Sequence, residues 1–458
     1  MSTTANLTGR LEGAVGKHRV VSAEEELAEY AVDGFLPEAI VRPQSAEEAA
    51  EVVRLASVEK LAIIAVGSRS KCGIGMPPKR YDIALDMSRM REIAHYDAGD
   101  LTLSVDAGMP LRELEDALAE KQQFLPLAVP CFGSSTAGGA IASGIDSVLR
   151  QQYGSARDFL IGAEFVDGRG KLCKSGGRVV KNVTGYDLHK LLIGSLGTIG
   201  VITRLNFRTF PLPETYGGHV ASFESGERAV AFRNRVEASG LPVANLELLS
   251  PAAAKITKAI LEKEDGPVPG CVESDSWAVY VSFEGSEKIV VRIAKDVERL
   301  VHEAGARKDE PLDAGADSQL GRVLREAFEW LRSAAPAVAL LRITLPRIVP
   351  ETLAELNQTG DLMRRAVLVR ACGVLYLSLM GEQEDERTRE ALARMTKDIF
   401  ALVEAKQGHA TLPHAPPLLK QQLSVWGPTA GDFSIMKKVK QAFDPDGVFA
   451  PGRYVGGL

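Results

Sequence analysis

Paired cysteines, long apolar runs and basic clusters are all missing from this chain. Its five cysteines are odd in number, scattered and never spaced as CxxC, which argues against a disulfide framework, a zinc ribbon or an iron–sulfur cluster. They are Cys72, Cys131, Cys173, Cys271 and Cys372. The longest apolar stretches, such as Leu61–Val66, are too short to span a bilayer. The formal net charge is −6 and no basic stripe is visible, so nucleic acid is not an expected partner.

The composition is that of a soluble protein with more than one domain. Hydrophobic residues make up 45% and charged residues 25% of the 458 residues, and about 150 residues per domain predict two or three domains. The N-terminus, Met1–Arg10, is polar and lacks the apolar core of a signal peptide. Unpaired thiols suit a reducing compartment, so we expect a cytoplasmic protein that would reach the inner membrane only through a partner.

The first part of the chain predicts an α+β domain punctuated by glycine turns. Ser45 and Glu48 form a capping box that opens a helix, and Leu61–Val66 is a buried strand that ends at Gly67. Further strands are expected at Tyr81–Asp86, Leu101–Ala107, Ile161–Val166, Lys171–Lys174 and Val201–Phe207, a hairpin turn at Asp167-Gly168, and helices over Pro110–Leu118 and Tyr186–Ser195. Pro211-Leu212-Pro213 is predicted to end this domain, which then spans residues 1–213.

After residue 213 strands alternate with longer amphipathic helices. This pattern predicts an α+β, ferredoxin-like cap domain over residues 214–417, with helices covering one face of its sheet. Strands are expected at Val220–Phe223, Val243–Leu248, Trp277–Phe283, Val338–Thr344 and Gly373–Leu379, and helices at Glu227–Ala238, Glu287–Ala304, Leu320–Arg332 and Glu386–Ala405. Asp265–Ser276 and Asp309–Ser318 are expected to be exposed loops. The last segment, 418–458, is predicted to return to the first domain.

The first of three glycine-rich stretches, Val66–Gly75, directly follows a buried strand and contains Gly67-Ser68-Arg69-Ser70-Lys71. Small residues let backbone N–H groups converge on an anion, the serines add hydroxyl donors, and Arg69 and Lys71 add positive charge. A diphosphate suits such a loop. The pattern is neither GxGxxG nor GxxxxGK[ST], so neither a Rossmann nor a Walker site is indicated. A plain turn between strands is the alternative interpretation.

The second and third stretches are equally poor in side-chain bulk. In Gly133–Gly144 every residue except Ile141 is small, which favours close approach of a ligand to the backbone. Close packing of a helix against a neighbouring element requires the same composition, and this alternative stays open. In Gly194–Thr203 a glycine-rich turn leads into a strand whose backbone could pair with an adenine edge. Together the three stretches predict a groove for one extended dinucleotide.

The order and spacing of these stretches resemble the FAD-binding fold of the vanillyl-alcohol oxidase and p-cresol methylhydroxylase (PCMH) type. Val41–Ser45, Val179–Leu188 and Gly197–Thr203 resemble its 2-hydroxy-acid branch, and the chain end from Val425 to Arg453 is similar to the glycolate oxidase FAD-binding subunit. The resemblance covers residues 38–213 strongly and 414–458 well, whereas between them it is mainly architectural.

The resemblance implies roles for particular residues. The first stretch would hold the FAD diphosphate, the second would line the path from diphosphate to flavin, and the backbone of Ile202 would meet the adenine end. No histidine lies in the first loop, so the implied FAD is non-covalent, and His95 is expected to be exposed or hydrogen-bonded instead of linked to flavin. The implied FAD-binding residues are Gly67, Ser68, Arg69, Ser70, Lys71, Gly133, Ser134, Thr136, Gly138, Gly139, Ser143, Gly144 and Ile202.

Two positions depart from the catalytic members of that branch. Leu196 stands where they carry glutamate in Gly-Ser-Glu-Gly-Thr, and it resembles the FAD-binding subunit instead. Ala450 replaces the asparagine of a terminal Asn-Pro-Gly motif, which removes a polar contact expected near the flavin.

Oxidation of a 2-hydroxy acid needs a cation for the carboxylate, a base for the hydroxyl proton and an acceptor for the hydride. Arg332 and Arg342 are the candidates for binding the carboxylate, and no catalytic base is identified. His409 and His414 lie five residues apart across a proline, so they are expected to be exposed loop histidines and predict no metal site.

The FAD site is therefore better defined than the substrate site. This asymmetry favours the FAD-binding subunit of a glycolate-oxidase-like 2-hydroxy-acid dehydrogenase complex, working with a homologous catalytic flavoprotein and an iron–sulfur subunit. A free-standing FAD-dependent dehydrogenase of D-2-hydroxy acids such as lactate or glycolate is the first alternative, and a non-catalytic assembly scaffold is the second.

Overall fold

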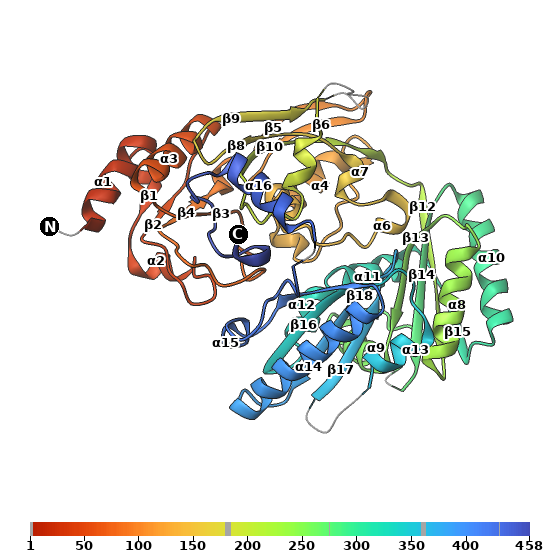
Figure 1. Ribbon diagram of the computed structural model, residues 1–458. Helices are drawn as coiled ribbons and strands as arrows, with labels where there is room; N and C mark the ends of the chain where they lie inside the picture. The colour runs from red at the N-terminus through yellow and green to blue at the C-terminus, as the bar shows by residue number, and fades with distance from the viewer. Residues whose placement is uncertain (1–2, 179–184, 274, 359–362, 430) are drawn as a thin grey trace.

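Two sheets of moderate size and one large sheet organise the chain, whose computed structural model describes residues 3–178, 185–273, 275–358, 363–429 and 431–458 (Figure 1). The 4-stranded sheet has the order β1-β2-β4-β3, and the 5-stranded sheet has the order β5-β6-β10-β8-β9. Their strands are β1 (Val20–Val21), β2 (Ala39–Val41), β3 (Ile63–Val66), β4 (Ile83–Asp86), β5 (Ile93–Asp97), β6 (Thr102–Asp106), β8 (Leu160–Val166), β9 (Leu172–Gly176) and β10 (Val201–Arg208).

The 4-stranded sheet positions the first glycine-rich stretch. Its strands β2, β3 and β4 run parallel and are buried, because α1 (Thr3–Val15) and α3 (Ala46–Glu59) pack against them. Ser45 begins α3 by accepting a hydrogen bond from the Glu48 N–H at 3.2 Å, as the capping box predicts. Since β3 ends at Val66, the stretch lies at the carboxyl end of a parallel strand, the usual place of ligands in such sheets.

Most elements predicted in this half are confirmed, including the hairpin of β8 and β9. The predicted helix at Tyr186–Ser195 is only a 3₁₀ turn over Leu188–Leu192, and Pro110 precedes α4 instead of beginning it. Residues 179–184, part of one segment that carried the family resemblance, lie outside the described residues. The remaining short elements are α2 (Glu24–Ala28), α4 (Leu111–Ala119), β7 (Gln123–Phe124), α5 (Ala137–Ser143), α6 (Arg150–Tyr153), α7 (Ala156–Phe159) and β11 (Phe210–Pro211).

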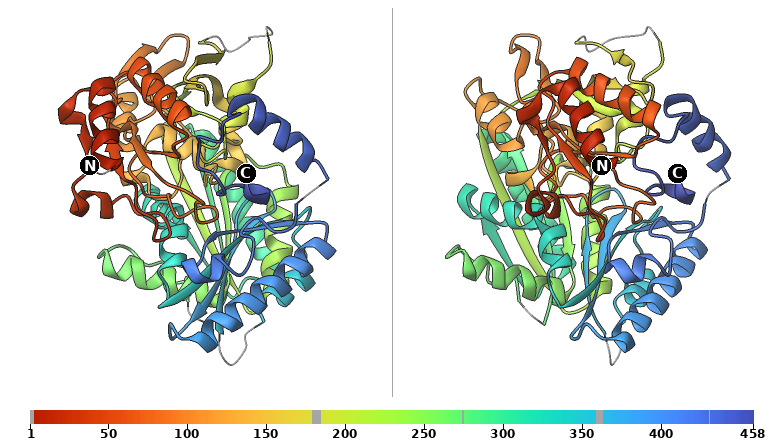
Figure 2. Two further views of the ribbon diagram at one scale, coloured as in Figure 1. Left: turned by 60° about the vertical axis from the view of Figure 1, so that its left-hand side comes forward. Right: turned by 90° about the vertical axis from the view of Figure 1, so that its left-hand side faces the viewer.

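The large sheet has eight antiparallel strands in the order β15-β12-β14-β13-β17-β18-β16-β19. The first half of the chain lies against one side of it, as the two views of Figure 2 show. The strands are β12 (Thr215–Phe223), β13 (Val243–Leu249), β14 (Trp277–Gly285), β15 (Lys308–Leu312), β16 (Ala337–Thr344), β17 (Met363–Val369), β18 (Val374–Gly381) and β19 (His409–His414).

Helices cover both faces of this sheet, whereas the sequence predicted one covered face. Val279 and Val281 of β14 pack in the core beneath α8 and α10, while Ala278 and Tyr280 pack in the core beneath α9 and α11. The helices are α8 (Gly226–Ala238), α9 (Pro251–Lys263), α10 (Glu287–Ala304), α11 (Ala314–Arg325), α12 (Ala327–Arg332), α13 (Pro350–Leu356) and α14 (Glu386–Ala405).

The loop predicted at Asp309–Ser318 is wrong, because it contains most of edge strand β15 and the start of α11. Charged residues and a proline hide this strand from sequence patterns and are typical of sheet edges.

The C-terminal segment crosses back to the first half of the chain (Figure 1). After α15 (Pro417–Lys420) and α16 (Phe433–Phe443), the N–H of Gly168 donates to Phe443 O at 2.8 Å and that of Ile63 to Val448 O at 2.7 Å. The domain limits 1–213, 214–417 and 418–458 stay a prediction. Within the described ranges, no helix combines the length and apolarity that crossing a bilayer requires.

Candidate cofactor site

The three glycine-rich stretches border a single cavity of about 750 Å³, counted out to its open mouth. Gly133, Ser134 and Gly144 of the predicted set do not line it. The predicted residues that do are Gly67, Ser68, Arg69, Ser70, Lys71, Thr136, Gly138, Gly139, Ser143 and Ile202. Other lining residues come from neighbouring strands and from the chain end, among them Arg453.

Backbone donors without partners distinguish the first stretch. Within the described part of the chain, the N–H groups of Ser68, Arg69, Ser70 and Lys71 donate no hydrogen bond to a protein acceptor. Unpaired N–H groups are unusual in folded proteins unless they face water or a ligand. Because the residues line the cavity, these donors are available to an anion there.

The charged side chains that line the cavity are all cations. They are Arg69, Lys71 and Arg453, and no carboxylate is among the described lining residues. Arg69 has a left-handed backbone with φ 66° and stacks over the Tyr30 ring at 4.3 Å. Arg453 is 3% exposed and donates to the carbonyl oxygens of Cys72 and, at 2.6 Å, Ile74. Burial lowers the pKa of Arg453. The cavity therefore favours a ligand with negative charge.

Two features of the structure explain why the second stretch consists of small residues. Thr136 caps α5 by accepting from the Gly139 N–H at 3.2 Å. A Cβ at Gly138 would lie 2.9 Å from Ala107 O, and one at Gly144 would lie 2.7 Å from the Gly194 Cα. Close packing between protein segments thus accounts for part of this composition, as the alternative interpretation proposed. Gly138 also lines the cavity, so both explanations apply to it.

The two departures from the family pattern lie in different surroundings. Leu196 lines the cavity with a left-handed backbone, φ 51°. Ala450 is 1% exposed and packs with Ile64 and Val66 in a core beside β3. It does not line the cavity, so the polar contact expected of an asparagine at this position would be made elsewhere.

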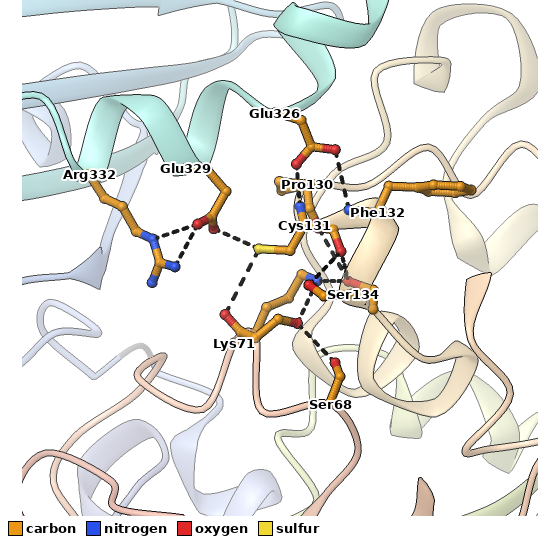
Figure 3. Close-up of polar contacts among 11 residues, drawn as sticks. Ser68, Lys71, Pro130, Cys131, Phe132, Ser134, Glu326, Glu329 and Arg332 are labelled. Atoms are coloured by element: carbon orange, nitrogen blue, oxygen red, sulfur yellow. Dashed lines mark hydrogen bonds and ion pairs between the residues drawn. The ribbon is translucent and has the colours of Figure 1, made fainter. Parts of the chain in front are cut away.

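Lys71 connects the cavity to a polar cluster at the boundary with α12 (Figure 3). Its ammonium donates to Ser135 Oγ, and burial lowers the pKa of Lys71, although the negative charge of Glu329 opposes this shift. The Cys131 thiol donates to Glu329 Oε1 at 2.6 Å. Burial raises the pKa of this thiol to about 12, so it is neutral at pH 7. Glu326, which directly precedes α12, accepts the backbone N–H of Cys131 at 2.6 Å and so ties the segment before the second stretch to the start of α12.

Both candidate substrate arginines are held by carboxylates. Arg332 donates to Glu329 Oε2 at 2.6 Å, and Arg342 donates to the buried Asp146 at 2.6 Å. Arg332 thus joins the Lys71 cluster, whereas Arg342 links β16 to the segment after α5.

His409 and His414 lie on strand β19, so the prediction of loop histidines is wrong. His414 is half-buried at the end of β19, and Pro413 beside it hid the strand from the sequence pattern. Burial and the charge of Arg332 lower its pKa to about 4. His95 is exposed on β5, as predicted.

Sequence reasoning missed Arg453 and Cys131 as members of the site. Arg453 reaches Cys72 across 381 residues of chain, and Cys131 meets Glu329 across 198 residues. Neither contact has a local sequence signal. The spacing of the cysteines argued only against sites built from several cysteines and said nothing about Cys131 alone. Arg453 was noted only as part of the chain end that resembles the family.

The arrangement fits FAD. A diphosphate would satisfy the free N–H groups of the first stretch and the cations beside them, and the small residues of the second leave space for an extended ligand. A cavity of this kind, without GxGxxG, is not a Rossmann site.

Comparison with known proteins leads to the same cofactor. Residues 37–176 match the family model of the FAD binding domain, and residues 213–454 match that of the FAD linked oxidases, C-terminal domain. The chain is 26% identical over 431 residues to glycolate oxidase subunit GlcD of Bacillus subtilis (strain 168), covering 91% of this chain and 89% of that protein. It is 38% identical over 164 residues to glycolate oxidase subunit GlcE of Escherichia coli (strain K12), covering 36% and 46%.

A solved structure confirms the predicted fold. The crystal structure of p-cresol methylhydroxylase with substrate bound matches with a TM-score of 0.78 at 15% identity, covering 99% of this chain and 97% of that one. The family matches and this shared fold confirm the α+β, PCMH-type prediction and FAD as the cofactor. The chain belongs to the FAD-linked oxidases and is an FAD-dependent oxidoreductase.

Proposed function

We propose that this chain is the FAD-binding subunit of a glycolate-oxidase-like complex that oxidises small 2-hydroxy acids. The observation that carries the proposal is the run of free N–H groups from Ser68 to Lys71, facing a cavity whose charged lining is entirely cationic. Similarity to glycolate oxidase subunits of two bacteria supports the substrate class.

The first stretch and two cations hold FAD non-covalently in this proposal. The N–H groups of residues 68–71 donate to the diphosphate, Lys71 and Arg453 balance its charge, and the backbone of Ile202 meets the adenine end. Gly138, Gly139 and Ser143, which line the cavity, keep the path towards the flavin free of bulk. When bound, FAD supplies the acceptor for the hydride that leaves the α-carbon of the substrate.

The state of the two arginines supports a division of labour between subunits. Glu329 pairs with Arg332 and Asp146 pairs with Arg342, so the positive charge that each guanidinium offers a substrate carboxylate is already partly neutralised. Leu196 also places an alkyl group at the cavity, where catalytic relatives carry a carboxylate. We therefore propose a homologous catalytic flavoprotein and an iron–sulfur subunit as partners, in the cytoplasm, with any membrane attachment made by a partner.

An anaerobic titration of the purified, FAD-loaded chain with glycolate and D-lactate tests the proposal. We expect the flavin absorbance to stay that of oxidised FAD when the chain is alone and to bleach when the two partner subunits are co-expressed. A lone monomer that bleaches and turns over at full rate would contradict it. A chain that purifies without FAD, and whose Gly138→Trp variant still assembles, would leave only the scaffold role.

A free-standing D-2-hydroxy-acid dehydrogenase is the second candidate, favoured by similarity to the D-lactate dehydrogenase of Anaerostipes hadrus, which is 25% identical over 429 residues. Since burial and the Arg332 charge lower the pKa of His414 to about 4, its imidazole is a weak base and does not supply the catalytic base. This candidate predicts that D-lactate bleaches the flavin without partners and that Arg332→Gln abolishes bleaching while Arg364→Gln, at an exposed position on β17, does not.

A further inference from the structure

A second cavity lies between α4 and the large sheet. It encloses about 1420 Å³ counted to its open mouth and shares no lining residue with the FAD cavity. One wall is apolar and comes from α4 and the segments around it, including Leu111, Leu114, Leu118 and Phe132. The opposite wall is polar and comes from the sheet and α11. A cavity with one wall of each kind suits an amphipathic small molecule.

The polar wall follows from strand alternation. Tyr280, Ser282 and Glu284 alternate along β14 and therefore share one face, and Asn245 of β13 is the register partner of Ser282. On the other side Ser282 pairs with Gly218 of β12, where a Cβ would overlap Asp317 Oδ1. The glycine leaves room for that carboxyl, which comes from α11.

The carboxyls of this wall form no ion pair with any residue that the structure describes. Among the described residues, Glu284 accepts only from the Tyr153 hydroxyl, and Asp317 accepts from Tyr280 Oη at 2.7 Å and Ser282 Oγ at 3.1 Å. They are 7% and 4% exposed. Burial raises the pKa of both carboxyls, that of Asp317 to about 6, because no positive partner offsets their loss of hydration.

An independent observation shows that the wall lacks a donor. Asn245 lines the cavity and is 2% exposed, yet its Oδ1 has no hydrogen-bond partner within the described part of the chain. Buried side-chain amides are normally satisfied, so an orphan acceptor beside two unpaired carboxyls indicates a missing hydrogen-bond donor.

The surroundings of this wall do not indicate a metal ion as its missing partner. Within the described residues no group of three or more His, Cys, Asp or Glu side chains could hold a metal ion. Three arginines also line the cavity, but Arg322 is paired with Glu264 at 2.8 Å and Arg325 with Glu326 at 3.4 Å. The third, Arg112, is exposed and forms no ion pair with Glu284 or Asp317 among the described residues.

We propose that this cavity binds a primary aliphatic ammonium compound. The ammonium donates to Glu284, Asp317 and Asn245, and the alkyl body packs against Leu111, Leu114 and Leu118 of α4. The site is separate from the FAD cavity, so the proposal does not depend on the substrate proposed above.

Calorimetric titration of the FAD-loaded chain with n-hexylammonium chloride tests this site, with sodium hexanoate as the probe of equal length and opposite charge. We expect saturable binding of one hexylammonium per chain, no binding of hexanoate and an unchanged flavin spectrum. Glu284→Gln keeps the acceptor for Tyr153 and removes the charge, so it should weaken binding about tenfold or more. Asp317→Asn is the second variant, should the first fail to fold.

The matched control is Glu115→Gln, which removes an exposed carboxylate that lines the same cavity. It should change the affinity by less than about twofold, because exposed ion pairs contribute little. The proposal is overturned if hexylammonium does not bind, if hexanoate binds as tightly, if Glu284→Gln and Glu115→Gln have the same affinity, or if binding displaces FAD.

Discussion

Gly67 is the position at which one methyl group tests how the first two glycine-rich stretches fit together. A Cβ there would overlap Thr136 Oγ1 and lie 3.1 Å from Thr136 Cγ2. Thr136 is 4% exposed and has little room to move, and its Oγ1 is the N-cap of α5. Gly67→Ala must therefore displace the cap.

The expected cost follows from two terms. Loss of an N-cap costs about 1 kcal/mol and overpacking of a tight site about 1–3 kcal/mol. Replacing glycine gives back about 0.4–1 kcal/mol through the unfolded chain. We expect Gly67→Ala to lower the free energy of unfolding by about 1–3 kcal/mol in urea titration of the apoprotein, and to weaken FAD binding measured by flavin fluorescence.

Two further variants make the test specific. Gly73→Ala makes the same exchange where no atom lies within 4 Å of the new Cβ, so it should be neutral or slightly stabilising. In a Thr136→Ala background both the cap and the clashing atoms are gone, so Gly67→Ala should cost at least about 1 kcal/mol less than in the wild type. An equal cost in both backgrounds would refute this account of Gly67.

Three other predictions concern buried charges. Asp146→Asn removes the buried carboxylate that pairs with the half-buried Arg342 and should cost about 1–3 kcal/mol in urea unfolding. Although burial alone would raise the pKa of Asp146, Arg342 lowers it below 3.8, so this stabilisation is complete above pH 4 and is lost as the pH falls further. Burial raises the folded-state pKa of Asp317 from 3.8 to about 6, so ionisation destabilises the protein as the pH rises through that window. When unfolding is measured at pH 5 and at pH 7, the stability of Asp317→Asn relative to the wild type should be about 1 kcal/mol higher at pH 7, and no change would contradict the shift. Lys71→Met should weaken FAD binding about 10- to 100-fold in a fluorescence titration, whereas Lys79→Met, outside the cavity, should not.

Local signals in the sequence located the first stretch, which lines the cavity, and its role as an anion loop stays a prediction. A buried strand, a glycine turn and two cations in ten residues are enough to indicate an anion loop, and the capping box at Ser45 and Glu48 located α3. These features depend on near neighbours in the chain.

Contacts between segments that are distant in the sequence could not be predicted from local sequence patterns. The pairing of Cys131 with Glu329, the approach of Arg453 and the edge strand β15 all depend on tertiary packing. The composition of the second stretch was ambiguous for the same reason. Gly138 and Gly144 pack closely against residues that are distant in the sequence, and such contacts cannot be predicted from local pattern.

Hydrogen–deuterium exchange of the peptide that spans residues 67–72, with and without FAD, tests the central claim most directly. The free N–H groups of Ser68 to Lys71 should exchange fast in the apoprotein and become strongly protected when FAD binds. FAD binding that protects other segments but leaves this peptide unchanged would contradict the assignment of the first stretch to the diphosphate.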